Sequence, residues 1–340
     1  MTLGEEDYEV FSVRFHPLDN WLACGSGDGA VRLYNLKDGK CEHTLTGPLN
    51  QHGEIVDPMP VTSVRWRPDS HHFQSRNVLV CSYADGTLRH FHATTGQIIH
   101  EIHGKEAVPA NSLYMIEFNR DGTKLATCGL DKTVRLYDEQ TKALIINLKE
   151  TRTQCGHSNR VFCVKFNPAD PHMLVSGGWD NTVQIYDIRK KGAASSIFGP
   201  HVCGDSIDFK NDGHTLLTGS YRNDDCLELW DLRKNQRLRS FDWNGPETGV
   251  LQKDENGIEV SQHQIPKDIL GTAKPYPAPY IYSAMFNNKQ DMIIAGGAGA
   301  NQVRLFDFDS GKVVSMIGDL PRAVLAMGKS PNTNEFAFSC

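Results

Sequence analysis

The chain has 340 residues, of which 39% are hydrophobic and 22% are charged, and its formal net charge is −6 at pH 7. This composition is typical of a globular protein that buries a core, and it argues against overall disorder. Because acids and bases are interspersed and acids prevail, we expect no basic surface that would attract nucleic acid or an anionic membrane.

Residues 1–10 are acidic and lack the basic start and apolar run of a secretory signal. No segment approaches the length of about eighteen apolar residues that a membrane-spanning helix requires. The nine Cys residues, an odd count without a signal, are expected to be reduced thiols. We therefore expect an intracellular, cytoplasmic protein, while nuclear, cytoskeletal and ciliary locations stay open.

Six copies of one pattern follow one another along the chain. In each copy a strand-like run ends in a turn, at Pro17, Pro68, Gly122, Pro168, Gly213 and Asn288. A small-residue run then leads into an alternating run with an aromatic residue near its end, at 31–35, 88–92, 134–138, 183–187, 227–231 and 303–307. Alternation bounded by tight turns predicts half-buried strands. The copies end 44 to 76 residues apart, and a basic unit of about 45 residues with four strands predicts a propeller blade.

These repeats resemble the WD-repeat family of β-propellers. Trp230-Asp231 is a literal WD pair, and Gly156-His157 matches the Gly-His pair that opens a unit of the family. The resemblance implies an all-β, seven-bladed WD-repeat propeller in one domain, with an incomplete seventh blade. The blades are expected at about 5–46, 61–103, 111–149, 157–199, 201–243 and 280–317, with a partial one at 321–340.

The resemblance also implies structural roles for several polar residues. In the fourth copy, His157, Ser176 and Asp180 stand in the order of the family's buried hydrogen-bond chain, in which the turn acid accepts a bond from the His. The turn acids of the first three copies, Asp28, Asp85 and Asp131, are expected to act structurally in the same way.

Residues 321–340 supply only two strands for the seventh blade, and residues 1–4 supply a stub. Three explanations stay open: the chain is a fragment or a short isoform, the ring closes loosely, or a partner donates a strand. Two connections are long, 47–60 and 242–279. For the second, both a solvated insertion and a partner contact at 275–280 stay open.

No catalytic, metal-binding or cofactor-binding motif is found. The glycines of 296–301 precede a further strand rather than a helix, so they indicate a hairpin turn and not a phosphate site. Pairs such as His71-His72 lack a second cluster at metal-ligand spacing, and there is no nucleophile elbow. We therefore expect no cofactor and no enzyme activity, although a site within the channel stays open.

Two consecutive copies end in Asp-x-Arg, as Asp187 with Arg189 and Asp231 with Arg233. The pattern resembles the box by which some WD-repeat proteins dock onto the adaptor of cullin-RING ubiquitin ligases. The simpler interpretation is that each Arg pairs with a neighbouring acid.

In members of the family, the residue before each turn acid lies at the rim of the channel. Trp, Tyr and Arg are the residue types that dominate binding hot spots. The candidate partner-binding residues are therefore Trp179, Tyr221, Arg222, Leu130, Tyr83 and Arg160. We expect a non-catalytic interaction scaffold within a multiprotein assembly, which binds proteins or peptides through its decorated loop face. The alternative is a substrate receptor of a cullin-RING ubiquitin ligase.

Overall fold

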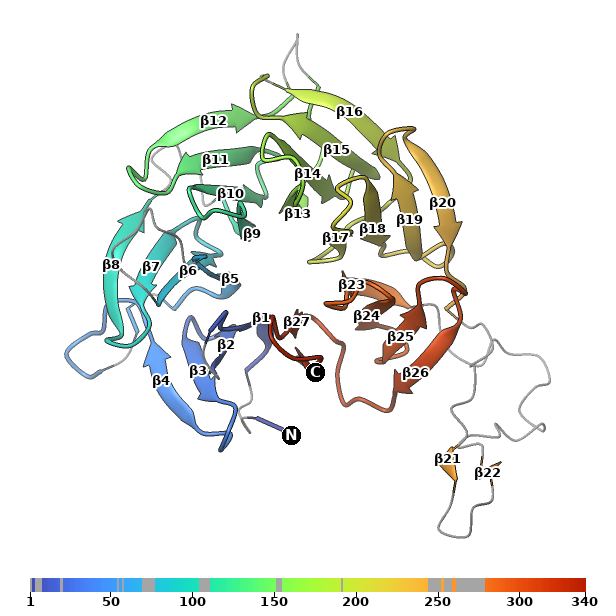
Figure 1. Cartoon of the computed structure of the whole chain (residues 1–340). Coiled ribbons are helices and arrows are strands. Elements are labelled where there is room, and N and C mark those ends of the chain that lie inside the picture. The colour runs from blue at the N-terminus through green and yellow to red at the C-terminus, as the bar shows by residue number, and fades with distance from the viewer. Residues whose placement is uncertain are drawn as a thin grey trace.

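The computed structural model describes residues 2–3, 8–18, 21–53, 55–56, 58–68, 77–103, 111–150, 155–190, 192–243, 252–253, 259–260 and 279–340. Every regular element in these ranges is a β-strand. The strands form six four-stranded antiparallel sheets, in each of which the strands pair in chain order. Figure 1 shows the six sheets as blades around a central channel, each with its first strand innermost.

The first three blades occupy the first half of the chain. Blade one consists of β1 (Val10–Phe15), β2 (Trp21–Ser26), β3 (Val31–Asn35) and β4 (Cys41–Leu45). Blade two consists of β5 (Val61–Trp66), β6 (Val78–Tyr83), β7 (Leu88–His92) and β8 (Gln97–Ile102). Blade three consists of β9 (Leu113–Phe118), β10 (Lys124–Gly129), β11 (Val134–Asp138) and β12 (Leu144–Leu148).

The other three blades follow in the same way. Blade four consists of β13 (Val161–Phe166), β14 (Met173–Gly178), β15 (Thr182–Asp187) and β16 (Ala193–Phe198). Blade five consists of β17 (Ile207–Phe209), β18 (Thr215–Gly219), β19 (Leu227–Asp231) and β20 (Gln236–Ser240). Blade six consists of β23 (Tyr280–Phe286), β24 (Met292–Ala298), β25 (Val303–Asp307) and β26 (Val313–Ile317).

The prediction of seven blades with an incomplete seventh is corrected by the structure, whose described residues form six. Residues 321–340 form only β27 (Met327–Lys329) and β28 (Phe336–Phe338), a two-stranded hairpin. Two strands of three residues are too few for a four-stranded blade. The hairpin lies beside β1 (Figure 1), where Arg14 Nη1 donates to the carbonyl of Met327 at 2.6 Å. Whether a partner adds a strand to it stays a prediction.

The long connection expected at 242–279 lies mostly outside the described residues, apart from β21 (Gln252–Lys253) paired with β22 (Glu259–Val260). His71 and His72 also lie outside them. The glycine-rich segment at 296–301 joins β24 to β25 as a hairpin turn, with positive φ at Gly299 and Asn301.

Apolar packing between neighbouring blades forms the core. A glycine on the second strand lets the next blade come close: a Cβ on Gly25 would lie 2.7 Å from a methyl of Val61, and one on Gly177 would lie 2.7 Å from a methyl of Ile207. Val61 and Ile207 are fully buried in these contacts. Each sheet thus hides its apolar faces only against its two neighbours, as in other repeat folds.

The inner strands of five blades carry a β-bulge near their beginning. The bulge leaves one residue without a partner on the second strand, namely Phe11, Thr62, Tyr114, Phe162 and Tyr282. A bulge re-aims a side chain and increases the local twist. In blade four the second strand accommodates the bulge with Gly178, because a Cβ there would lie 2.4 Å from the carbonyl oxygen of Arg160.

Replacing Gly178 with Ala tests this close approach. The added methyl meets backbone that cannot move alone, so we expect Gly178→Ala to lower the free energy of unfolding by about 2 kcal/mol. Gly27→Ala is the matched control, because its Cβ would lie at ordinary distances from its neighbours, 3.4 Å from the Phe11 ring and 3.7 Å from the Glu9 carbonyl oxygen. Chemical denaturation followed by circular dichroism measures both variants, and equal stabilities would contradict the proposed role of the bulge.

Candidate functional site

Aromatic side chains form a row at one mouth of the channel. The Tyr114 and Phe162 rings, both from bulges, stack at 4.5 Å with an angle of 5° between their planes. The Phe162 ring lies 5.2 Å from that of Trp179, and the Trp179 ring lies 5.9 Å from that of His201. The row therefore runs without a break from blade three across blade four to the start of blade five.

Three tyrosines form a second ring cluster where blades five and six meet, and the Tyr221 backbone N–H donates to the His201 carbonyl at 2.8 Å. The Tyr221 ring stacks on that of Tyr280 at 4.3 Å and meets that of Tyr282 edge-on at 5.7 Å. Tyr221 and Tyr280 also form an isolated β-bridge, which joins the two blades through the backbone. We call the seven residues Tyr114, Phe162, Trp179, His201, Tyr221, Tyr280 and Tyr282 the aromatic rim.

Trp179 is half-buried within this rim. The Arg160 guanidinium lies over the Trp179 ring at 4.7 Å, a cation–π contact, and the Trp179 amide donates to the Arg160 carbonyl at 3.0 Å. Burial raises the pKa of the neighbouring Cys203 thiol, with Trp179 and Arg160 acting in the opposite direction. Trp179 and Arg160 therefore pack against each other within the aromatic rim.

The other predicted partner-binding residues differ in how they are placed. Tyr221 is 36% exposed and Leu130 is 37% exposed, so both are open to a partner. The Arg222 guanidinium instead binds within the protein: it donates to the carbonyl of Gly199, after β16, at 2.8 Å and to that of Asp225, in its own turn, at 2.6 Å. Tyr83 is fully buried beneath Arg89, and its assignment as a partner-binding residue is corrected.

Five residues of the aromatic rim were not singled out from the sequence. Tyr114, Phe162 and Tyr282 lie on inner strands, in which simple alternation does not show the extra residue of a bulge. The usable signal is an aromatic residue three positions before a charged residue on the same inner strand, as in Tyr114 before Glu117 and Phe162 before Lys165. His201 lies in a connection between blades, for which the repeat pattern makes no prediction, and Tyr280, the first residue of β23, was covered only by the segment 275–280, for which a solvated insertion and a partner contact both stayed open.

A network of charged residues crosses the channel below the aromatic rim. The Asp205 carboxylate accepts bonds from Arg14, from Arg65 Nη2 at 3.0 Å and from Lys165 Nζ at 3.1 Å. Glu117 accepts from Arg65 Nε at 2.9 Å and pairs with Lys165 at 3.4 Å. These residues come from five blades, so the network links inner strands on opposite sides of the ring.

Asp205 is the residue that makes this crossing possible. In sequence, Asp205-Ser206-Ile207 matches Phe11-Ser12-Val13, so Asp205 takes the place of the bulge residue in blade five. Where the other blades have an aromatic residue or Thr at this position, blade five has a carboxylate that reaches the charged network.

Burial and charge act against each other within the network. Burial alone would raise the pKa of Glu117, but Lys165, Arg65 and Arg14 hold it below its usual value. Burial, followed by the neighbouring Arg65, lowers the pKa of Arg14 to about 9. Burial of the charged arginines costs desolvation free energy, and the attraction of the acids in the network offsets that cost.

Of the residues given structural roles, His157, Ser176 and Asp180 form a separate, buried group in blade four. His157 Nδ1 lies 2.8 Å from Asp180 Oδ2, and His157 Nε2 lies 2.7 Å from Ser176 Oγ. Burial alone would raise the pKa of Asp180, but His157 holds it below its usual value. In all four turns the acid accepts the backbone N–H two residues on: Asp28 at 3.2 Å, Asp85 at 2.8 Å, Asp131 at 3.2 Å and Asp180 at 3.2 Å.

The two Asp-x-Arg segments have the same geometry. Arg189 donates twice to Asp187, with both distances 2.8 Å, and Arg233 donates twice to Asp231 at 3.1 and 3.0 Å. Both arginine side chains are nevertheless 64% exposed. The hydrogen bonds from Arg233 lower the pKa of Asp231 to about 2, so the pair stays charged at neutral pH.

Within the described ranges, no group of three or more His, Cys, Asp or Glu residues is placed to hold a metal ion. The same part of the chain contains no helix with the length and apolar character needed to cross a membrane.

A ring of four-stranded blades around a channel defines a β-propeller. The family model described as "WD domain, G-beta repeat" matches residues 1–35, 39–92, 96–138 and 148–187, just over half of the chain. The chain therefore belongs to the WD-repeat family, and the assignment from the Trp230-Asp231 and Gly156-His157 pairs is confirmed.

Among known proteins, the chain is similar to the guanine nucleotide-binding protein subunit beta of Nicotiana tabacum, with 28% identity over 65% of this chain and 57% of that protein. It is also similar to the nuclear distribution protein PAC1 of Komagataella phaffii, with 29% identity over 54% of this chain and 36% of that protein. The U3 small nucleolar RNA-associated protein 15 homolog of Xenopus tropicalis is 32% identical over 44% of this chain and 28% of its own length. The chain thus matches little more than half of the first relative and less of the others.

Replacing Glu117 with Gln tests the channel network. Loss of the charge leaves Arg65 and Lys165 undercompensated, so we expect Glu117→Gln to lower the free energy of unfolding at pH 7 by about 2 kcal/mol. Because Lys165, Arg65 and Arg14 hold the folded-state pKa of Glu117 below its usual value, its contribution is complete above the pKa that Glu117 has in the unfolded chain. The contribution is lost as the pH falls through the folded-state pKa.

Urea denaturation from pH 7 into the acid range measures the free energies of unfolding of the wild type and Glu117→Gln. The difference between them should shrink as the pH falls. Asp224→Asn, at an exposed turn acid, is the control and should follow the wild type throughout. A difference that is independent of pH would rule out the charge as its cause.

Proposed function

We propose that this protein is a non-catalytic interaction scaffold that binds a peptide or a protein loop on the aromatic rim. The observation that carries the proposal is a pair of ring clusters at one mouth of the channel, one running from Tyr114 to His201 across blades three to five and the other formed by Tyr221, Tyr280 and Tyr282 where blades five and six meet. Aromatic side chains provide large contact areas with few rotatable bonds, and they are enriched at the centres of protein interfaces.

The rigidity of the aromatic rim supports binding. The rings are held by stacking and by the β-bridge between Tyr221 and Tyr280, so little conformational entropy remains to be lost when a partner binds. Tyr221 and Leu130, each more than a third exposed, provide apolar surface around the half-buried Trp179. A net charge of −6 favours protein partners over nucleic acid. The tobacco relative is named as a subunit, which agrees with a role in an assembly.

Selection from a displayed random-peptide library tests this proposal. Peptides enriched on the wild-type protein should bind Tyr221→Ala at least tenfold more weakly, because the change removes an exposed ring of the aromatic rim. Phe198→Ala is the matched control: Phe198 is 74% exposed but lies on the outer strand β16, away from the channel. Fluorescence polarisation measures the affinities.

The result that would contradict the proposal is equal binding by the wild type and Tyr221→Ala. Stronger loss in Phe198→Ala would instead place the binding surface on the outside of the ring. Circular dichroism confirms that both variants are folded before binding is compared.

A second candidate function is docking onto the adaptor of a cullin-RING ubiquitin ligase through Asp187, Arg189, Asp231 and Arg233. The observation that favours it is the repeated geometry in consecutive blades, in which each Asp orients an Arg that is still 64% exposed. An Arg held flat by a carboxylate keeps N–H groups available to a second acceptor.

The double variant R189A/R233A tests the docking function. We expect at least a tenfold loss of adaptor retained in a pull-down with purified components, with an unchanged melting temperature because both side chains are exposed. Arg237→Ala removes another exposed arginine of blade five and serves as the control. Equal retention by the double variant and the wild type would eliminate this function.

A further inference from the structure

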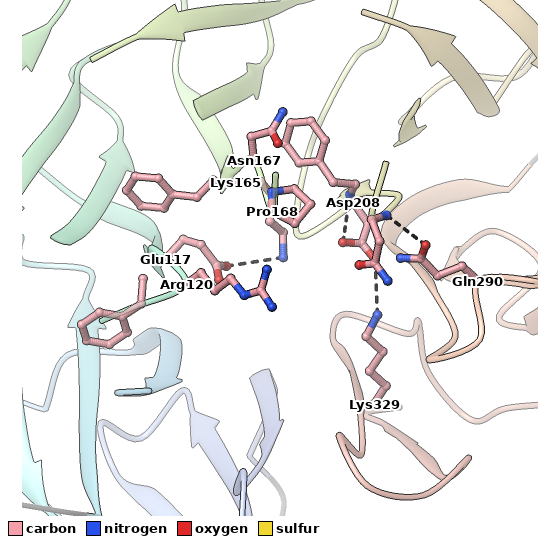
Figure 2. A pocket seen from close by; sticks show the side chains of 12 residues that line it. Glu117, Arg120, Lys165, Asn167, Pro168, Asp208, Gln290 and Lys329 are labelled. Carbon is pink, nitrogen blue, oxygen red and sulfur yellow. Dashed lines mark hydrogen bonds and ion pairs between the residues drawn. The ribbon is translucent and has the colours of Figure 1, made fainter. Parts of the chain in front are cut away.

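The second mouth of the channel contains a cavity of about 620 Å³. Its walls are the ends of the inner strands of blades three, four and five, together with Gln290 of blade six and Lys329 of the hairpin. Figure 2 shows these side chains around one open space. Its volume lies in the range of pockets that bind small molecules or short peptide segments.

This cavity lies on the face opposite to the aromatic rim. Phe162 is near the beginning of β13 and belongs to the rim, whereas Phe166, at the end of the same strand, lines the cavity. Tyr114 and Phe118 have the same relation on β9. A six-residue strand is about 20 Å long, so its two ends lie at different mouths of the channel. The charged network, which includes Glu117 and Lys165 of these strands, lies between the two mouths.

Positive charge prevails in the cavity. Its lining includes the cations Arg120, Lys165 and Lys329 and the acids Glu117 and Asp208. In Figure 2 the head groups of all three cations are directed into the open space. Within the part of the chain that the structure describes, no hydrogen bond or ion pair is recorded for the exposed Arg120.

The two acids already have partners within the protein. Asp208 accepts bonds from the backbone N–H groups of Phe286 and Phe209 at 2.9 and 3.0 Å, and Lys329 Nζ lies 3.6 Å away. Glu117 is occupied by Arg65 and Lys165 in the channel network. The acids therefore satisfy internal donors, while the Arg120 guanidinium keeps its donors for a ligand.

A neutral donor lies on the other side of the cavity. The Gln290 side-chain oxygen accepts a hydrogen bond from the Asn211 backbone N–H at 2.9 Å. This bond fixes the orientation of the amide and does not involve its NH₂ group. The Phe118, Phe166 and Phe209 side chains contribute apolar wall between these polar groups.

We propose that this cavity binds the carboxylate side chain of an acidic peptide segment. In this site the carboxylate pairs with the Arg120 guanidinium, and Lys329 and the Gln290 amide are placed around the same space. Arginine binds carboxylates with two parallel hydrogen bonds, which gives affinity and orientation together. Because Glu117 and Asp208 are also in the wall, a singly charged carboxylate suits the site better than a doubly charged phosphate.

This site is independent of the aromatic rim, so the two proposals can fail separately. The probe is a fluorescein-labelled tetra-aspartate peptide with blocked ends, and the matched peptide is tetra-asparagine. We expect the wild type to bind the acidic peptide, and Arg120→Ala to bind it about tenfold more weakly or worse. Gln290→Ala is the second variant and should weaken binding without removing a charge.

Lys289→Ala is the matched control, because Lys289 is exposed, precedes Gln290 in the same turn and is absent from the cavity wall. It should bind as the wild type does. Equal losses in Lys289→Ala and Arg120→Ala would show attraction by the whole face and overturn the site. Equal binding of the two peptides would also overturn it, and stronger competition by pyrophosphate than by free peptide would overturn the choice of a carboxylate.

Discussion

The structure depends on the burial of both faces of each blade against its neighbours. A four-stranded sheet of some forty residues cannot bury its own apolar side chains, and a ring solves this for all blades at once. The contacts are close because second-strand glycines at positions 25 and 177 make room for Val61 and Ile207 of the following blades. This packing also places the first strand of every blade on the inside of the ring (Figure 1).

The channel network divides the surface of this ring into two chemically different mouths. Above Asp205 and Glu117, the bulge positions of blades three, four and six hold aromatic rings. Below them, the strand ends present Arg120 and Lys329 around an open cavity. One inner strand thus serves two surfaces, with its first residues on one and its last on the other. The aromatic rim suits an apolar partner, whereas the cavity suits an acidic one.

The sequence was sufficient for those features that repeat. The strand pattern and the family follow from runs that recur in every copy, and the contact between His157 and Asp180 follows from the resemblance of the fourth copy to the family. The bulges were missed because one additional residue on a strand does not break an alternation of only six residues, and for this reason Tyr114 and Phe162 were not recognised. Asp205 pairs with Arg14 across 191 positions of sequence, a separation that no local pattern reports.

Two further differences have a similar origin. Tyr83 lies one place too far from the turn: Ala84 precedes the turn acid Asp85, and the adjacent side chain on a strand points to the opposite face. The seventh blade was inferred from two strand-like runs, but these are three residues each and form a hairpin only. In both cases the repeat pattern was applied to residues that do not contain the pattern in full.

The seam between β1 and the β27–β28 hairpin has a consequence for kinetics. Asn332 donates to the carbonyl of Pro17 at 3.0 Å, so this contact joins residues 315 positions apart. Joining such distant segments costs more chain entropy than forming any single blade, and topologies rich in distant contacts fold slowly. The blades can therefore assemble in sequence as an open arc, and the circle closes last, which makes this seam the place where the fold is completed and where opening begins.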